Sequence, residues 1–137
     1  MGFCYCRMES NERRTMIIEL PFPDARLNPN QSNGKSWKST LVYRDAAKQT
    51  GYIQARSALE NQTLPPAPYY SISITFLPPD RRHRDADNLH AAMKNYIDGV
   101  CSALKINDAK FRSITLSFGE PRNPGATIVE IKPLEAE

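Results

Sequence analysis

The chain has 137 residues, of which 40% are hydrophobic and 24% are charged, and its formal net charge is +3. This length and composition fit one soluble globular domain, and no run of apolar residues is long enough to cross a membrane. The mild positive charge permits an anionic partner without indicating one. Three cysteines (Cys4, Cys6 and Cys101) are too few for a disulfide framework, so we expect a reducing, cytoplasmic compartment.

The first part of the chain predicts a tail, a strand and a long loop. Residues 1–14 are polar and lack periodicity, which indicates a flexible tail ahead of a single domain over 15–137. Residues 16–20 alternate between apolar and polar side chains, as a half-buried strand does, and prolines follow directly. Residues 21–36 are rich in Pro, Asn, Ser and Gly and therefore predict a loop.

The middle of the chain predicts two helices around a strand. Good helix formers occupy residues 37–61, although Gly51 weakens this helix and marks a place where it could break. Apolar residues alternate with Ser and Thr over 70–76, which predicts a half-buried strand. Residues 87–104 show the clearest helical spacing of apolar side chains in the chain.

The last part predicts two strands, one with Ile114, Leu116 and Phe118 on a single face and one with Val129 and Ile131. The loop from Gly119 to Gly125 is expected to join them as a hairpin. The predicted order is β-α-β-α-β-β. The expected fold is an α+β domain in which two main helices pack on a small mixed or antiparallel sheet.

The densest chemical signal is the run Pro79–Leu89 (PDRRHRDADNL), which lies between a predicted strand and a predicted helix. In extended backbone, Asp85 and Asp87 would share one face, with their carboxylates only a few Å apart. Two carboxylates this close repel each other unless a cation lies between them, and hard oxygen ligands favour magnesium or manganese. Asp108, in a turn before the next strand, could supply a third carboxylate.

The predicted helix adds further polar residues to this pattern. Lys94 and Asp98 fall within about 20° of the Asp87 face if each residue advances the helix by about 100°. Asp87, Lys94 and Asp98 therefore form one stripe opposite the apolar residues. A solvated helix face has the same appearance, so the stripe alone does not establish a site.

Basic residues surround these carboxylates. Arg81, Arg82 and Arg84 precede Asp85, and residues 80–112 hold seven Lys or Arg against five Asp. An acidic metal site within a basic surface suits a polyanion such as DNA, whose phosphates Arg would hold. His83 is interpreted as a surface or phosphate-contacting residue rather than a metal ligand. The only other histidine in the chain is His90, so no partner histidine lies beside it.

Structural interpretations of the same residues remain open. Asp85 or Asp87 could be the N-cap of the helix, and Asn107-Asp108 could be a simple turn, which the local sequence favours. No nucleotide cofactor is expected, because Gly34-Lys35-Ser36 lacks the first glycine of a P-loop.

This pattern resembles the RusA family of Holliday junction resolvases, which is found in bacteria and prophages. The likeness rests on the run Pro79–Leu89, continues through Lys94 and Asp98-Gly99, and ends at Asn107-Asp108. Weaker likeness covers the opening strand and the closing strands.

The resemblance implies that Asp85, Asp87 and Asp108 bind the metal, and Asn88 matches the residue that follows the family's aspartate pair. The sequence departs from the family at two positions. The family commonly has lysine where this chain has Ala91, and Lys94, nearly one turn further along, is expected to take the catalytic or phosphate-binding role. Asn107 stands where the family often has a second aspartate.

The resemblance further implies a bacterial or phage homodimer that binds four-way DNA junctions. It would make paired symmetric nicks with Mg²⁺, for which Mn²⁺ could substitute. Each of the two equivalent sites would hydrolyse one phosphodiester bond.

Other functions remain as alternatives. The chain could be a non-catalytic DNA-binding module, with its aspartates acting as caps, or a nuclease for another branched or structured nucleic acid. A structural interaction protein that docks through the 21–36 loop is a third alternative, but it leaves the paired aspartates beside three arginines unexplained.

Overall fold

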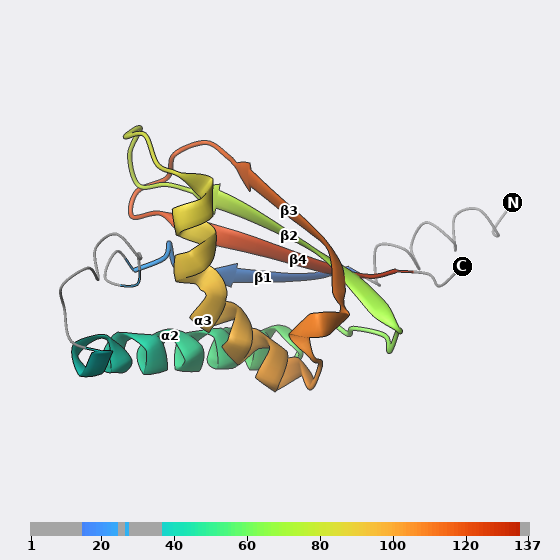
Figure 1. Ribbon diagram of the computed structural model, residues 1–137. Helices are drawn as coiled ribbons and strands as arrows, with labels where there is room; N and C mark the ends of the chain where they lie inside the picture. Colours follow the sequence, from blue (N-terminus) through green and yellow to red (C-terminus); the bar gives the residue numbers. More distant parts are fainter. Residues whose placement is uncertain (1–14, 25–26, 28–36, 135–137) are drawn as a thin grey trace, which may run out of the picture.

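The computed structural model describes residues 15–24, 27 and 37–134. The predicted tail at 1–14 and most of the predicted 21–36 loop lie outside these residues. The elements, in chain order, are β1 (Met16–Leu20), α2 (Trp37–Ala58), β2 (Tyr69–Leu77), α3 (Ala86–Leu104), a short 3-10 turn η2 (Asp108–Lys110), β3 (Phe111–Phe118) and β4 (Ala126–Leu134). This confirms the predicted α+β class and the predicted order (Figure 1).

The four strands form one mixed sheet in the order β1-β4-β2-β3. β4 runs antiparallel to both of its neighbours, whereas β3 runs parallel to β2. The predicted hairpin between the last two strands is therefore wrong. The 119–125 loop carries the chain past the end of β2, because the Gly119 N–H donates to the Phe76 carbonyl and the Arg122 N–H to the Pro78 carbonyl. β4 can then enter the sheet between β1 and β2.

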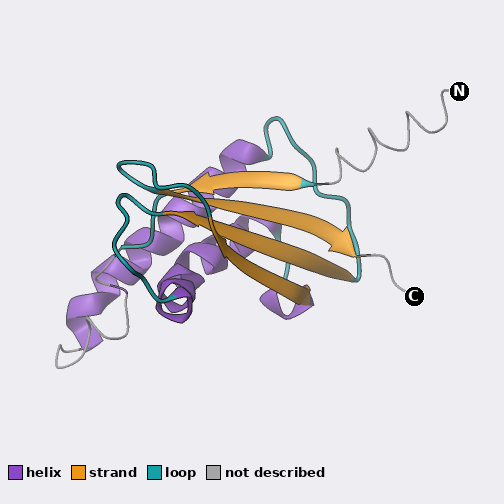
Figure 2. Cartoon of the chain, turned by 90° about the horizontal axis from the view of Figure 1, so that it is seen from above, coloured by secondary structure: helices purple, strands orange, loops and turns teal. Residues whose placement is uncertain are grey.

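Both helices cover the same face of the sheet, so the protein has two layers (Figure 2). Alternate residues of the strands point into the space between the layers, and the apolar side of α3 closes it. The largest fully buried side chains of this core are Met16, Ile18, Leu20, Ile74, Phe76, Met93, Val100, Thr127, Val129 and Ile131. The predicted inward faces of the first, second and last strands are thus confirmed.

Two glycines allow α2 and α3 to cross closely. A Cβ atom at Gly51 would meet the backbone of Tyr96, and one at Gly99 would meet the backbone of Lys48. Helix α2 continues through Gly51 without the break that the sequence suggested. The glycine is tolerated there because the close approach of α3 requires a residue without a side chain. Among the described residues, no helix is long and apolar enough to cross a membrane.

Candidate functional site

The carboxylate of Asp85 caps the N-terminus of α3. Asp85 has extended backbone (φ −87°, ψ 124°), and its Oδ1 accepts a hydrogen bond from the Asp87 N–H at 3.0 Å. Asp87 already lies in the first helical turn, where a negative charge is stabilised by the helix dipole. The two residues therefore do not form the extended pair that the sequence suggested. Both side chains are exposed to solvent.

Two residues of the predicted stripe on α3, Lys94 and Asp98, line a hollow between this helix and the outer part of the sheet, whereas Asp87 does not line it. We call it the α3–β3 hollow. Its lining residues are Ile72, Ile74, His90, Ala91, Lys94, Ile97, Asp98, Asp108, Phe111 and Ile114. Lys94 and Asp98 thus share one space, and Ala91 lies in its wall one turn after Asp87.

Asp108 reaches the same hollow from η2. The Asn107 side chain caps this turn by accepting a hydrogen bond from the Ala109 N–H at 2.9 Å, so Asn107 has a structural role. Burial raises the pKa of the Cys101 thiol to about 12, and the negative charges of Asp108 and Asp98 add to this shift. Asp98 on α3 and Asp108 in η2 line the same hollow, so the two carboxylates lie in one part of the molecule.

The basic run before α3 is organised by Asp80. Its carboxylate forms ion pairs with Arg84 at 2.9 Å and with Arg82 at 3.3 Å, and it accepts the Arg82 N–H at 2.9 Å. Hydrogen bonding from Arg84, followed by that from Arg82, holds the pKa of Asp80 far below its usual range. The ion pairs of Asp80 with Arg82 and Arg84 therefore stabilise the conformation of this loop.

The three predicted DNA-binding arginines differ in accessibility. The Arg84 side chain is only 16% exposed and its guanidinium lies 5.3 Å from the centre of the Phe22 ring. The Arg82 side chain is 81% exposed, and Arg81 and His83 are also exposed. Arg84 therefore holds the loop before α3 against Phe22, in the segment that follows β1. Arg81 and Arg82 remain accessible to solvent.

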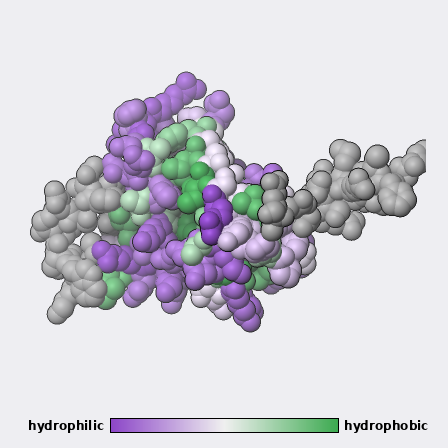
Figure 3. Space-filling model, turned by 45° about the vertical axis from the view of Figure 1, so that its right-hand side comes forward, coloured by the Kyte–Doolittle hydropathy of each residue, from purple (hydrophilic) through white to green (hydrophobic). Residues whose placement is uncertain are grey.

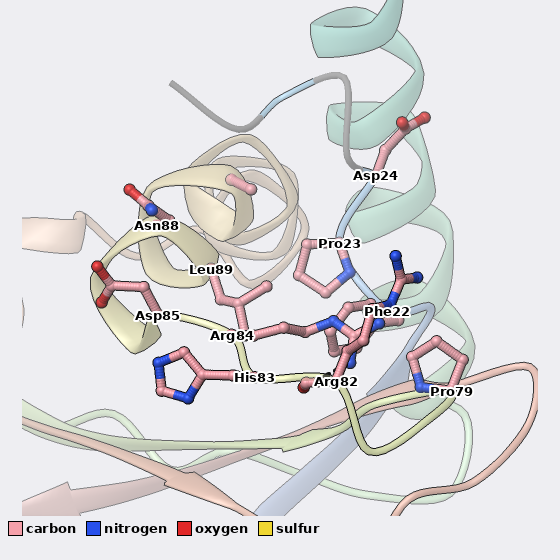
Figure 4. A pocket seen from close by; sticks show the side chains of 11 residues that line it. Phe22, Pro23, Asp24, Pro79, Arg82, His83, Arg84, Asp85, Asn88 and Leu89 are labelled. Atoms are coloured by element: carbon pink, nitrogen blue, oxygen red, sulfur yellow. Dashed lines mark hydrogen bonds between the residues drawn. The ribbon is translucent and has the colours of Figure 1, made fainter. Parts of the chain in front are cut away.

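Asp85 lies on a different hollow from Asp108. This second hollow is lined by Phe22, Pro23, Asp24, Pro79, Arg82, His83, Arg84, Asp85, Asn88, Leu89 and Ala92. Figure 4 shows Asp85 and Asn88 on the first turn of α3, with Arg84 directed toward Phe22 and Pro23. The predicted ligand set of Asp85, Asp87 and Asp108 is thus spread around the start of α3 and η2. Within the described part of the chain, no three His, Cys, Asp or Glu side chains are placed to hold a metal ion together.

His90 is a site residue that the sequence interpretation missed. It lines the α3–β3 hollow beside Lys94. Its spacing could have predicted this position, because His90, Lys94 and Asp98 recur every four residues and therefore share one helix face. The apolar floor of the hollow, formed by Ile72, Ile74 and Ile114, has no comparable signal because it depends on the pairing of two strands.

Comparison with known proteins finds a relative that is similar over nearly the whole chain. No family model matches the chain. An uncharacterized protein from Xylella fastidiosa is 30% identical over 131 residues, which cover 96% of this chain and 84% of that protein. Similarity at this level over nearly the whole length is that of two members of one family. The chain therefore belongs to the same family as this uncharacterized Xylella fastidiosa protein.

Proposed function

We propose that the protein is a magnesium-dependent endodeoxyribonuclease of the RusA type. It would resolve four-way DNA junctions in recombination and repair by paired phosphodiester hydrolysis. The observation that most supports this is the arrangement of Lys94, Asp98 and Asp108 around one hollow, a single turn from Asp87. Two exposed arginines, Arg81 and Arg82, lie in the loop that directly precedes α3.

The donor chemistry of the site fits Mg²⁺, whereas a closed cage of three protein ligands is not formed by the described residues. Mg²⁺ is commonly held by one or two carboxylates, with water and substrate phosphate completing its shell. We propose Asp85, Asp87 and Asp108 as the carboxylates that would hold the ion, with DNA phosphate as a further ligand that draws them together, because Asp85 lines a different hollow from Asp108. When bound, the ion would activate water and stabilise charge on the departing oxygen.

The chain's own cations would position the DNA. Arg81 and Arg82 extend from the loop before α3 and can contact phosphates on either side of the scissile bond. Lys94 would place an ammonium group at the mouth of the hollow, where phosphate charge increases during hydrolysis. Arg84 would act indirectly, because its ion pair with Asp80 and its contact with Phe22 hold the loop in place.

A cleavage assay tests this proposal. Purified protein is incubated with a labelled four-way junction or a matched linear duplex, in magnesium or in EDTA. We expect paired nicks in the junction only, dependent on magnesium, and a loss of at least about 100-fold in Asp87→Asn. Asp45→Asn removes an exposed carboxylate on α2 and is the matched control, which should cleave normally.

A second candidate, a non-catalytic DNA-binding module, is favoured by the structural role of the capping residues. Asp85 and Asn107 each cap a helix or turn, and Asp80 binds two of the arginines. This candidate predicts junction binding that is unaffected by magnesium and no nick under any metal. That result would reject the nuclease proposal, whereas cleavage of another branched DNA or of RNA would keep the chemistry and change the substrate.

A further inference from the structure

The floor of the α3–β3 hollow is apolar, although the proposed hydrolysis involves only polar groups. Ile72 and Ile74 of β2 and Ile97 of α3 are buried beneath it, and Ile114 of β3 is 52% exposed beside them. A strip of hydrophobic surface bordered by hydrophilic groups is visible in Figure 3. Apolar surface that is left open inside a polar rim commonly marks a place where a ligand binds. Phosphate and sugar groups would leave the isoleucines uncovered, so an apolar part of a ligand is needed to cover them.

A half-buried carboxylate borders this apolar floor. Asp98 lines the hollow from α3. Among the residues that the structure describes, none donates a hydrogen bond to the Asp98 side chain or forms an ion pair with it. A carboxylate only accepts hydrogen bonds, and partial burial removes some of the water that would donate them. The Asp98 carboxylate is therefore free to accept hydrogen bonds from a ligand that covers the floor.

The size and lining of the hollow fit a single nucleobase. Its volume is about 300 Å³, which is at the lower end for sites that bind small molecules. A nucleobase has two apolar faces and a polar edge, so one face can cover the isoleucines while the edge meets Asp98. In a duplex the faces are stacked and the edges are paired, so only an unpaired base can enter. Lys94 and Asp108 line the same hollow, so the base would belong to a nucleotide near the reacting phosphate.

We propose that the α3–β3 hollow binds one unpaired guanine of the DNA substrate, and that Asp98 selects this base. The guanine edge carries two neighbouring donors, N1–H and the N2 amino group, and the two oxygens of one carboxylate can accept from both. Adenine and cytosine carry a ring-nitrogen acceptor beside their amino group, and thymine has a carbonyl on each side of its N–H. Each of these bases would place an acceptor against the Asp98 carboxylate, which is unfavourable.

The inference rests on the proposed function, because it takes DNA as the ligand, but it requires no cleavage. Guanine-selective binding by a protein that never nicks DNA would uphold the base site and reject the nuclease proposal. Magnesium-dependent nicking by a protein with equal affinity for the four bases would do the reverse.

Binding to short single-stranded DNA tests the choice of base. The oligonucleotide is all thymine except for one central position, which holds guanine, adenine, cytosine or thymine. It is titrated by fluorescence anisotropy in calcium, which takes oxygen ligands as magnesium does, and nicking is checked on the same samples. We expect guanine to be bound roughly tenfold more tightly than the other bases, because two hydrogen bonds to a charged group distinguish it. Equal affinities for the four oligonucleotides would overturn the proposal.

Base analogues at the central position test which atoms are recognised. Hypoxanthine lacks the N2 amino group but keeps N1–H, so its affinity should fall between those of guanine and adenine. 7-Deazaguanine keeps both donors and lacks only the N7 acceptor, so it should bind as tightly as guanine. Tight binding of hypoxanthine together with weak binding of 7-deazaguanine would show that the opposite edge of the base is recognised, and the role of Asp98 would be wrong.

The Asp98→Asn variant tests the residue itself. An amide has one acceptor oxygen and presents its own amino group to the second guanine donor, so the preference for guanine should fall to about threefold or less. Asp45→Asn, which changes an exposed carboxylate of α2 outside the hollow, is the matched control and should keep the full preference. An undiminished preference in Asp98→Asn would remove this residue from the base site.

Two serine substitutions on β3 test the apolar floor. Ile114 lines the hollow, whereas Phe118, which is 47% exposed, does not. Both side chains are about half exposed, so both variants should fold, and circular dichroism checks this. Ile114→Ser should weaken binding of the guanine oligonucleotide roughly tenfold, and Phe118→Ser should leave it unchanged. Equal effects of the two substitutions would mean that the hollow does not hold the base.

Discussion

Asp85 is the residue at which a structural role and a proposed chemical role coincide. Its carboxylate caps α3, and the proposal also assigns it to the metal. Asn caps helices about as well as Asp, whereas Ala does not cap. The two roles can therefore be separated by comparing two substitutions at one position.

We expect Asp85→Ala to lower the free energy of unfolding by about 1 kcal/mol and Asp85→Asn to lower it by much less. Both should lose junction cleavage, because an amide is a poor substitute for a carboxylate toward Mg²⁺. Urea denaturation and the nicking rate are measured on the same preparations. Normal cleavage by Asp85→Asn would remove this residue from the ligand set and leave it as a cap.

At the same scale, the three arginines that precede α3 differ in accessibility, and their local sequence does not indicate this difference. Arg81, Arg82 and Arg84 are alike in the sequence, yet Asp80 binds Arg82 and Arg84, Phe22 packs against the Arg84 guanidinium, and Arg81 is exposed. Phe22 is 62 residues away from Arg84 in the sequence. A contact over that separation leaves no local pattern, so exposure of each arginine could not be predicted.

At the scale of elements, the crossing of α2 and α3 depends on Gly51 and Gly99. We expect Gly51→Ala and Gly99→Ala each to lower the free energy of unfolding by about 1–3 kcal/mol or more, because each new methyl group meets backbone of the opposite helix. Ser102→Ala, on an exposed position of α3, is the matched control and should be close to neutral. Chemical denaturation measures all three. A stabilising Gly51→Ala would show that helix propensity outweighs the close crossing.

The sequence predicted the identity and order of the elements well, because each depends on local spacing. The strand at Met16–Leu20 and helix α3 begin and end within a residue of their predicted bounds. Which strands pair with one another could not be predicted in the same way. Alternation over Ala126–Leu134 is the same for an edge strand as for one inserted between β1 and β2, so the expected hairpin was a natural but wrong choice.

At the scale of the whole molecule, the candidate site could be predicted as a set of residues but not as a geometry. Helical spacing placed Lys94 and Asp98 together, and both line the α3–β3 hollow. The link from Asp108 to them depends on the parallel pairing of β2 with β3, which brings η2 under α3. The hollow that Asp85 lines is completed by Phe22, Pro23 and Asp24 of the segment after β1, which is distant in the sequence.

The homodimer that the RusA resemblance implies and the nuclease proposal together make a prediction that neither makes alone. The Asp87, Lys94 and Asp108 proposed for each site come from one chain, so a mixed dimer of wild-type and Asp87→Asn subunits would keep one intact site. We expect it to nick a junction once and leave it unresolved, because resolution needs a cut in two strands. Differently tagged subunits are co-expressed, the mixed dimer is isolated through both tags in succession, and it is assayed on a junction labelled on each strand in turn. Complete loss of nicking in the mixed dimer would mean that each site requires Asp87 of both subunits, and the assignment of all three residues to one chain would then be wrong.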